Sequence, residues 1–340
     1  MTFYQETTST SDSYQILHEE EAGAFGHVSV CQDVATGAVV AVKYLKKGPS
    51  SINDLVLSEV IAHRNLYHPN IMLLRKVILT ETALGIVVEH AAGGNLQDYV
   101  RDNSPLQEVD ARSIFQQIVV ALLFLEAKAV GNHGLKIENI MLDKSTPPKV
   151  KMTDVGYFKC TEDHLPKSRV GSFGFVAPEV LLNKKDVNQK KADCWSVGII
   201  LYQLLYGEHP FEKPSDQEEG SVKRTLDRIV KVQYRLPSHA SSTSPEALDL
   251  LQHILVEDPA KRYSLQDMQA HPWFQKGLPT SLMRINEECL AMPEPDYYVS
   301  QPLDEMVTVI KHAMQPLDDD SFDDGFAADD YDDIDDLMDA

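Results

Sequence analysis

Cysteine is scarce in this sequence, with four residues among 340. They are Cys31, Cys160, Cys194 and Cys289, and no two of them have the CxxC spacing of a zinc site. So sparse a set excludes a disulfide-rich scaffold and indicates a cytoplasmic and/or nuclear protein. We interpret Cys160 and Cys194 as packing residues rather than redox sites.

Long apolar runs are also absent. The longest covers residues 118–125, far short of the roughly 18 residues that cross a bilayer. The polar start, residues 1–12, has neither the basic flank nor the apolar stretch of a signal peptide. We therefore expect no membrane partner.

Basic residues are outnumbered, with Lys+Arg 31 against Asp+Glu 52 and a formal net charge of −21. Twelve of the acidic residues are Asp between Asp318 and Asp339, a stretch without Lys, Arg or Glu. The rest of the chain is only mildly acidic. This balance argues against nucleic-acid binding through bulk electrostatics.

Residues 14–89 have the pattern of a small, β-rich lobe. Alternating apolar residues over 14–47, with the turn pair Thr36-Gly37, predict a hairpin. Pro49 and Ser50-Ser51 break the pattern and predict a helix from about Ile52 to Asn65. The apolar runs 71–79 and 84–89 predict two further strands.

From residue 95 the pattern is mainly helical. Residues 108–128 are apolar nearly all round at their centre, as in a buried helix. Short strands are predicted near 140–142 and 150–152, and further helices at 192–206, 222–232, 245–255 and 265–270. The sequence thus predicts an α+β fold with a β-rich small lobe (14–89), a hinge (90–94) and a mainly helical large lobe (95–274).

Seven short motifs follow one another in order over residues 14–274. They are Gly23-Ala-Phe-Gly26-His-Val28, Val40-Ala-Val-Lys43 with Glu59, His68-Pro-Asn70, Asp154-Val-Gly156, Ala177-Pro-Glu179, Asp193-Cys-Trp-Ser-Val-Gly198 and Arg262. In this order they resemble the eukaryotic protein kinases. The stretches HRNLYHPNI, EHAAGGNL, PFEKPSD and HPWFQKGLP resemble the plant sucrose-non-fermenting-related kinases of subfamily two.

The resemblance implies a two-lobed kinase fold that binds ATP and Mg²⁺. It assigns Lys43 to the α- and β-phosphates, with Glu59 holding that lysine, and Lys136 to the γ-phosphate. It assigns Asn139 and Asp154 to Mg²⁺, which prefers oxygen ligands. The remaining nucleotide-binding residues that it implies are Gly23, Gly26, Val28, Ala41, Glu89 and Ala91, with Val88 as the gatekeeper. Two alternatives stay open: Lys43 and Glu59 as surface residues, and Asn139 as a loop cap.

The catalytic loop departs from the family pattern. Active kinases read H-R-D-L-K-x-x-N, whereas this chain reads Asn132-His-Gly134-Leu-Lys136-Ile-Glu-Asn139. Gly134 stands where the family has its catalytic Asp, so no side chain there accepts the proton of the substrate hydroxyl. A positioned general base is worth about 10²–10⁴ in rate. Rescue by the adjacent His133 stays an alternative.

Two further departures add to this loss. Glu21 stands at the first glycine of the phosphate-binding loop, where a carboxylate repels phosphate and a Cβ restricts the turn. We therefore expect weakened ATP binding. His133 stands where the family has the arginine that binds a phosphorylated activation segment. A histidine cannot donate the two parallel hydrogen bonds by which an arginine binds a phosphate. Ser168 and Ser172 lie where the family carries regulatory phosphosites, with ordinary loop serines as the alternative.

Beyond the kinase-like domain, we expect a linker (275–301), a regulatory amphipathic helix (302–314) and a disordered acidic tail (315–340), after a flexible start (1–13). The apolar stripe of the helix is Leu303, Met306, Val307, Ile310 and Met314. By resemblance the helix docks on the helix that carries Glu59; a different partner is the alternative. By resemblance the tail recruits protein phosphatases, and related kinases are further candidate partners; the alternative is a solvated tail.

Three functional hypotheses follow. The first is a pseudokinase, a scaffold, decoy or regulator in stress-type signalling whose phosphotransfer is absent or weak. The second is a slow protein serine/threonine kinase, because Lys43, Glu59, Lys136, Asn139 and Asp154 remain. The third is an acidic binding protein that has lost nucleotide altogether.

Overall fold

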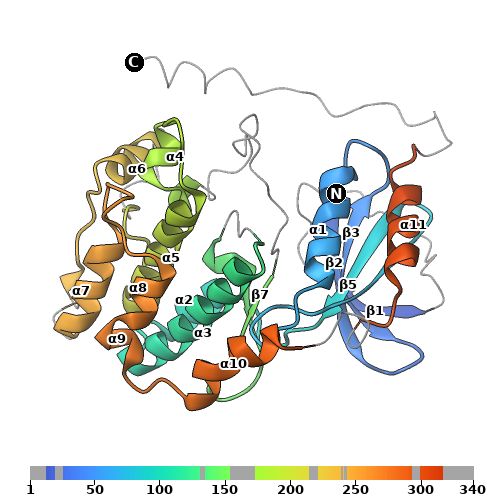
Figure 1. Ribbon diagram of the computed structural model, residues 1–340, viewed down its shortest axis with the longest axis horizontal. Coiled ribbons are helices and arrows are strands. Elements are labelled where there is room, and N and C mark those ends of the chain that lie inside the picture. The colour runs from blue at the N-terminus through green and yellow to red at the C-terminus, as the bar shows by residue number, and fades with distance from the viewer. Residues whose placement is uncertain are drawn as a thin grey trace.

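The structure is a computed structural model that describes residues 13–19, 26–130, 135–153, 173–213, 221–238, 240, 243–292 and 299–316. Two lobes lie side by side (Figure 1). One contains a five-stranded sheet with helices against it, and the other is mainly helical. The predicted α+β architecture, with a β-rich small lobe and a helical large lobe, is confirmed.

The sheet of the small lobe is antiparallel throughout, with strand order β1-β2-β3-β5-β4. Its strands are β1 (Tyr14–Glu19), β2 (Gly26–Asp33), β3 (Val39–Lys46), β4 (Leu74–Leu79) and β5 (Ala83–Glu89). Alternation places Val40, Val42 and Tyr44 in one apolar cluster and Leu45 in another, on the opposite face. The predicted hairpin is present, with Gly37 at φ +72° in its turn.

Helix α1 (Asp54–Arg64) packs on the Leu45 face of the sheet through Val60. It begins later than predicted, because Asn53 is its N-cap and accepts hydrogen bonds from the N–H groups of Leu55 and Val56. The prediction of a cap at Ser50-Ser51 and a start at Ile52 is therefore wrong. The strand predicted from residue 71 also begins later, at Leu74.

The large lobe is built around two long helices, α3 (Glu108–Ala127) and α5 (Gln189–Tyr206), whose central residues are almost all buried. Around them lie α2 (Leu96–Asn103), α4 (Pro178–Leu181), α6 (Ser221–Val230), α7 (Pro245–Ile254), α8 (Leu265–Ala270) and α9 (Pro272–Gln275). Two short strands, β6 (Ile140–Leu142) and β7 (Val150–Met152), pair antiparallel. Single 3₁₀ turns form η1 (Ile137–Asn139) and η2 (Phe173–Phe175).

The segment predicted as a linker contains a helix, α10 (Thr280–Leu290), which packs on the large lobe through Leu282, Ile285 and Cys289. Helix α11 (Leu303–Ala313) follows and lies against β4, β5 and α1 (Figure 1). Its buried residues are Met306, Ile310 and Ala313. The predicted stripe was wrong at Leu303, which is 43% exposed at the first position of the helix.

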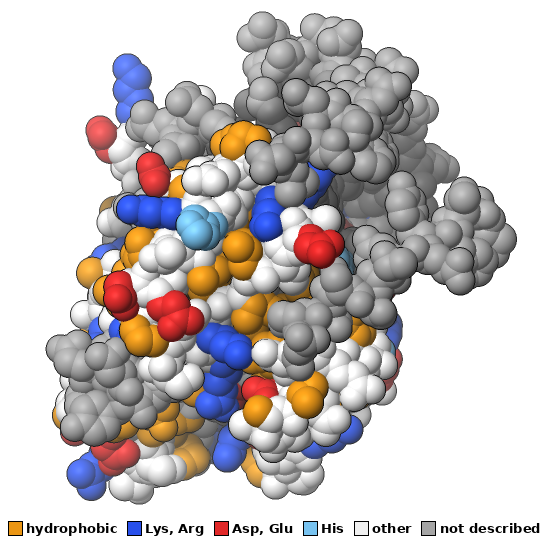
Figure 2. Space-filling model, turned by 90° about the vertical axis from the view of Figure 1, so that its right-hand side faces the viewer, with side chains coloured by type: hydrophobic (Ala, Val, Ile, Leu, Met, Phe, Trp, Pro, Cys, Tyr) orange, Lys and Arg blue, Asp and Glu red, His pale blue; other side chains and the backbone are white. Residues whose placement is uncertain are grey.

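At the small-lobe end, Lys and Arg, Asp and Glu, and apolar side chains are mixed over the described part of the surface (Figure 2). Among the described helices, none combines the length and apolar character that a membrane span requires.

Candidate nucleotide-binding site

Lys43 and Ala41 lie on β3 and point to the same face of the sheet, the face on which α1 packs. Lys43 is opposite Val28 of β2 and opposite Ile86 of β5. Glu59 lies on α1, next to Val60, and Val60 shares an apolar cluster with Ile86. The sheet register therefore gathers Val28, Ala41 and Lys43 into one small area beside the helix that carries Glu59.

Gly26 begins β2 at the end of the predicted phosphate-binding loop. Its φ is +149°, and a Cβ at this position would lie 1.8 Å from the carbonyl oxygen of Tyr44. No residue with a side chain fits that distance. The structure thus gives Gly26 a steric role, close approach of β2 to β3, beside the nucleotide role that the sequence suggested.

The predicted hinge is held to both lobes through Glu89. One Glu89 oxygen, Oε1, accepts a hydrogen bond from the Leu73 N–H at 2.9 Å and pairs with Lys151 Nζ at 2.7 Å. Lys151 lies on β7 of the large lobe, and both side chains are about four-fifths buried. This pair was not predicted from the sequence, because Lys151 alternates with the buried Val150 and Met152 as a lysine on the outer face of a strand does.

The segment after the hinge docks on β6. Gly93 N–H donates to the Leu142 carbonyl at 2.7 Å, and Leu142 N–H donates to the Gly94 carbonyl at 2.9 Å. A Cβ on Gly93 would lie 2.4 Å from the Asp143 carbonyl oxygen, so the approach requires glycine. This contact places the buried Ala91 close to the strand that starts immediately after Asn139.

Lys136 and Asn139 lie together on the η1 turn, where Asn139 N–H donates to the Lys136 carbonyl at 3.1 Å. Thr153 N–H donates to the Asn139 carbonyl at 3.1 Å, which brings the position before Asp154 to the same turn. Neither the Lys136 ammonium nor the Asn139 side-chain amide has a hydrogen-bond partner within the described part of the chain. Backbone hydrogen bonds thus hold the two residues that carry these candidate ligand groups within a single turn.

The remaining predicted residues lie outside the described part of the chain. They are Gly23 and Glu21 of the phosphate-binding loop, His133 and Gly134 of the catalytic loop, Asp154, and the candidate phosphosites Ser168 and Ser172. Their predicted roles stay predictions.

The protein kinase domain model matches residues 14–274. The chain belongs to the protein kinase family.

Several relatives are plant serine/threonine-protein kinases. SRK2E of Arabidopsis thaliana is 40% identical over 307 residues, which cover 90% of this chain and 83% of that protein. SAPK9 of Oryza sativa subsp. japonica is 39% identical over 306 residues, with 90% and 83% covered. SRK2A of Physcomitrium patens is 38% identical over 303 residues, with 89% and 85% covered. The resemblance to subfamily two is confirmed.

The family uses ATP and Mg²⁺, and the donor types at this site are suited to that ion. Asn139 supplies an amide oxygen that is not hydrogen-bonded to any described residue, and Asp154 follows Thr153 directly in the chain. Amide and carboxylate oxygens are hard ligands of the kind that Mg²⁺ prefers. In the described ranges, no three His, Cys, Asp or Glu side chains gather into a further candidate metal site.

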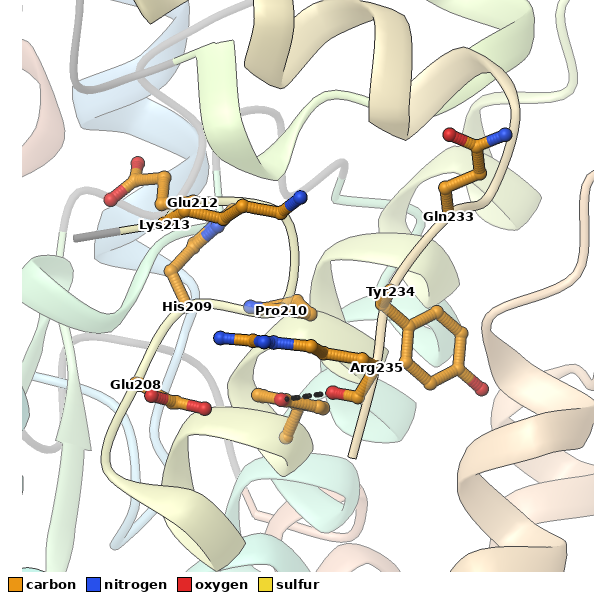
Figure 3. Close-up of a pocket in the computed structure, with 9 residues that line it drawn as sticks. Glu208, His209, Pro210, Glu212, Lys213, Gln233, Tyr234 and Arg235 are labelled. Atoms are coloured by element: carbon orange, nitrogen blue, oxygen red, sulfur yellow. Dashed lines mark hydrogen bonds between the residues drawn. The ribbon is translucent and has the colours of Figure 1, made fainter. Parts of the chain in front are cut away.

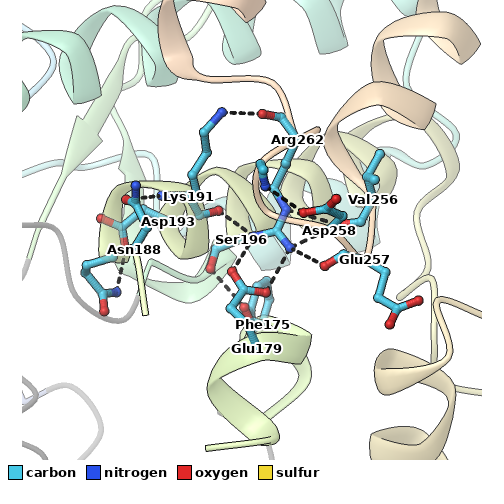
Figure 4. A network of polar contacts seen from close by, with 12 residues as sticks. Phe175, Glu179, Asn188, Lys191, Asp193, Ser196, Val256, Glu257, Asp258 and Arg262 are labelled. Carbon is cyan, nitrogen blue, oxygen red and sulfur yellow. Dashed lines mark hydrogen bonds and ion pairs between the residues drawn. The ribbon is translucent and has the colours of Figure 1, made fainter. Parts of the chain in front are cut away.

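By the family resemblance the activation segment spans 154–179, and η2 and α4 lie at its end. Three polar contacts hold η2 and α4 to the rest of the large lobe. Ser196 Oγ donates to the Phe175 carbonyl at 2.9 Å, and His209 Nε2 lies 3.2 Å from the Gly174 carbonyl. Burial lowers the pKa of His209 to about 4, so its ring is neutral near pH 7. The third contact is the ion pair of Glu179 with Arg262 (Figure 4). Glu179, Ser196 and Arg262 are members of the predicted motifs, but the Glu179–Arg262 pair was not predicted, and His209 was in none of the motifs.

A small cavity of about 240 Å³ lies in the large lobe beside His209. Glu208, Tyr234 and Arg235 are among its lining residues (Figure 3). None of the predicted nucleotide residues lines it. The cavity is therefore distinct from the site on β3 and η1.

Proposed function

We propose that this protein is a kinase-fold signalling protein with lost or strongly reduced phosphotransfer, which acts as a scaffold, decoy or regulator in stress-type signalling. The observation that carries the proposal is Gly134, because glycine offers no carboxylate at the position of the catalytic base. Loss of a general base raises the barrier by roughly 3–5 kcal/mol. Mg-ATP binding is retained but weakened, because Glu21 replaces a loop glycine.

The alternative is an active but slow kinase that transfers the ATP γ-phosphate to protein Ser or Thr. The η1 turn favours it, because it holds Lys136 and Asn139 together as phosphate- and metal-binding groups require. Positioning and charge neutralisation supply much of the acceleration in phosphoryl transfer. An intact scaffold therefore supports residual activity even without the base.

Phosphate transfer from radiolabelled ATP to a generic protein substrate distinguishes the two. For the pseudokinase we expect no transfer above that of Lys43→Met, and a thermal shift with Mg-ATP that is small but measurable. Transfer that disappears in Lys43→Met would establish the slow kinase. Absence of both transfer and thermal shift would favour a protein that has lost nucleotide.

Restoring the carboxylate tests Gly134 directly. Gly134→Asp is expected to raise transfer by about 10²-fold or more, the lower part of the range for a general base. Gly37→Asp is a matched control, since it adds the same side chain at an open hairpin turn. No gain in Gly134→Asp would mean that Glu21 or His133 also limits the reaction.

We further propose that protein phosphatases or related kinases bind the acidic tail, and that the protein is cytoplasmic and/or nuclear. Support comes from the twelve Asp after residue 317, interrupted by apolar residues such as Phe322 and Ile334. Such a segment offers negative charge that attracts a basic partner surface and apolar side chains that can be buried in the interface. Replacing Asp by Asn between 318 and 339 in the full chain is expected to abolish co-purification of these partners; unchanged capture would contradict it.

A further inference from the structure

The cavity beside His209 is lined by two chain segments, each of which follows a helix. Residues 208–213 come directly after the C-cap of α5, and residues 233–235 come shortly after α6. The buried Tyr202 of α5 joins the two segments, because its hydroxyl donates to the Arg235 carbonyl at 2.7 Å. Tyr234 packs edge-on against the Tyr202 ring, with 6.1 Å between the centroids. Contacts with the interior of the large lobe therefore fix the walls of the cavity.

Val232 gives the second segment its direction. It lies just after α6 with φ +49°, a conformation that a β-branched residue rarely adopts. Its N–H donates to the Ile229 carbonyl at 3.0 Å, and the Gln233 N–H donates to the Arg228 carbonyl at 2.8 Å. These two bonds close the end of the helix and turn the chain back toward α5. Backbone strain of this kind is concentrated at functional sites, so the strained turn favours a functional role for the cavity that it shapes.

The charged side chains of the lining balance one another. Two carboxylates, of Glu208 and Glu212, are matched by the cations of Lys213 and Arg235. His209 is neutral near pH 7, because burial lowers its pKa. A lining with no net charge favours a ligand that carries one charge of each sign over a simple anion or cation.

Two of these groups have no hydrogen-bond or ion-pair partner in the part of the chain that the structure describes. They are the Glu208 carboxylate and the Arg235 guanidinium, which line the same cavity without pairing with each other. The Arg235 side chain extends beneath Pro210, on the side where Glu208 lies (Figure 3). A guanidinium binds a carboxylate through two parallel hydrogen bonds, and a glutamate accepts from an ammonium. The two groups of one α-amino acid would therefore satisfy both residues.

The size of the cavity limits the ligand further. An apolar cavity of about 150 Å³ is enough for benzene, so the volume here, about 240 Å³, admits roughly ten non-hydrogen atoms. Pro210 and Tyr234 add apolar surface to the charged groups. A small amino acid leaves such a volume partly empty, whereas leucine has about the right number of atoms and an apolar side chain.

We propose that this cavity binds a free α-amino acid of about leucine size, with its carboxylate on Arg235 and its ammonium on Glu208. The apolar side chain of the ligand packs against Pro210 and Tyr234. The site lies apart from the candidate nucleotide-binding residues, and the proposal does not depend on whether the protein transfers phosphate.

The same ligand should stabilise η2, at the end of the activation segment. His209 lines the cavity, and its Nε2 donates to the Gly174 carbonyl at 3.2 Å. A Cβ on Gly174 would lie 2.8 Å from this nitrogen, so the two residues are in close contact. A ligand that restricts His209 therefore also restricts the backbone of η2.

Calorimetric titration of the full-length protein with leucine tests the site. We expect leucine to bind with a Kd in the millimolar range or below, as a ligand of roughly ten atoms can. N-acetyl-leucine lacks the ammonium and leucine amide lacks the carboxylate, so each should bind at least about 10-fold more weakly. Equal binding of the three compounds would overturn the proposal, as would the absence of leucine binding at about 10 mM.

Two variants assign the charges of the ligand. Arg235→Met should weaken leucine binding by about 10- to 100-fold and remove the preference for leucine over leucine amide. Glu208→Gln should remove the preference for leucine over N-acetyl-leucine. Lys231→Met is the matched control, since Lys231 is exposed just after α6 and does not line the cavity. Unchanged leucine binding in both Arg235→Met and Glu208→Gln would overturn the proposal.

The fold of these variants is checked by their thermal midpoints without ligand. The midpoints should match the wild type, because both side chains are exposed and make no polar contact with a described residue. Hydrogen exchange then tests the coupling to η2: leucine should slow exchange over 173–175 in the wild type and not in Arg235→Met. Unchanged exchange over 173–175 in the leucine-bound wild type would overturn the coupling, as would an equal change over α10.

Discussion

Arg262 and Glu179 form a two-pronged ion pair in the interior of the large lobe, with Nη1–Oε1 at 2.7 Å and Nη2–Oε2 at 2.9 Å. Both side chains are almost completely buried. Arg262 also donates to the carbonyls of Lys191 and Val256 (Figure 4). Its guanidinium lies over the Trp195 ring. The end of the activation segment is therefore fixed to a residue 83 positions later in the chain.

Breaking this pair should destabilise the protein strongly. Glu179→Gln leaves a buried guanidinium without its counter-charge, and we expect a loss of about 3–5 kcal/mol in the free energy of unfolding. Urea denaturation measures it. Arg101→Ala, which breaks an exposed pair with Asp98, is the control and should cost less than about 1 kcal/mol. Equal losses in the two variants would contradict the role of burial.

Gly26 should tolerate no side chain. Gly26→Ala places a Cβ 1.8 Å from the Tyr44 carbonyl oxygen, so β2 must move away from β3 near Lys43. We expect a loss of more than about 1 kcal/mol in stability and a reduced thermal shift with Mg-ATP. Gly37→Ala is the comparison, because Gly37 also has a positive φ, of +72°, but has open space where a Cβ would lie. A wild-type nucleotide response in Gly26→Ala would show that strand spacing does not matter for binding.

Loss of Lys151 should loosen the hinge. Lys151→Met leaves the Glu89 carboxylate partly buried, with the Leu73 N–H as its one remaining donor among the residues that the structure describes. We expect a loss of about 1–3 kcal/mol in the free energy of unfolding. Because Glu89 borders the hinge, the Mg-ATP thermal shift should fall as well. Lys149→Met, on an exposed position just before the same strand, should change neither quantity. An unchanged Mg-ATP thermal shift in Lys151→Met would show that this ion pair does not affect nucleotide binding.

Acid should destabilise the protein through His209. Its folded-state pKa is lowered to about 4 from 6.5, so the folded state binds fewer protons than the unfolded state in this interval. Stability is therefore lost as the pH falls from about 6.5 through 4. In His209→Gln the side-chain amide can still donate to the Gly174 carbonyl, but it does not titrate. Between pH 7 and 4 the free energy of unfolding should therefore fall by about 3 kcal/mol more in the wild type than in this variant. Denaturant midpoints across that range measure it; the exposed His253→Gln should behave like wild type.

Local features of the fold were predictable because neighbouring residues determine them. The alternation in β3 and the apolar centre of α3 gave the correct element types. Boundaries were less accurate where a cap decides them: Asn53, rather than the serines before it, starts α1. Helix α10 was not predicted: its segment was predicted to be a linker, whereas the structure packs its apolar residues on the large lobe.

The sequence by itself determined the family, the order of the motifs and the absence of a carboxylate at Gly134, since each is a property of residue identity and spacing. Only the tertiary structure decided the partners of Arg262 and Glu89. Those contacts join residues 83 and 62 positions apart. Which polar groups meet over such separations depends on how the helices and the sheet pack, and short-range periodicity carries no information about that.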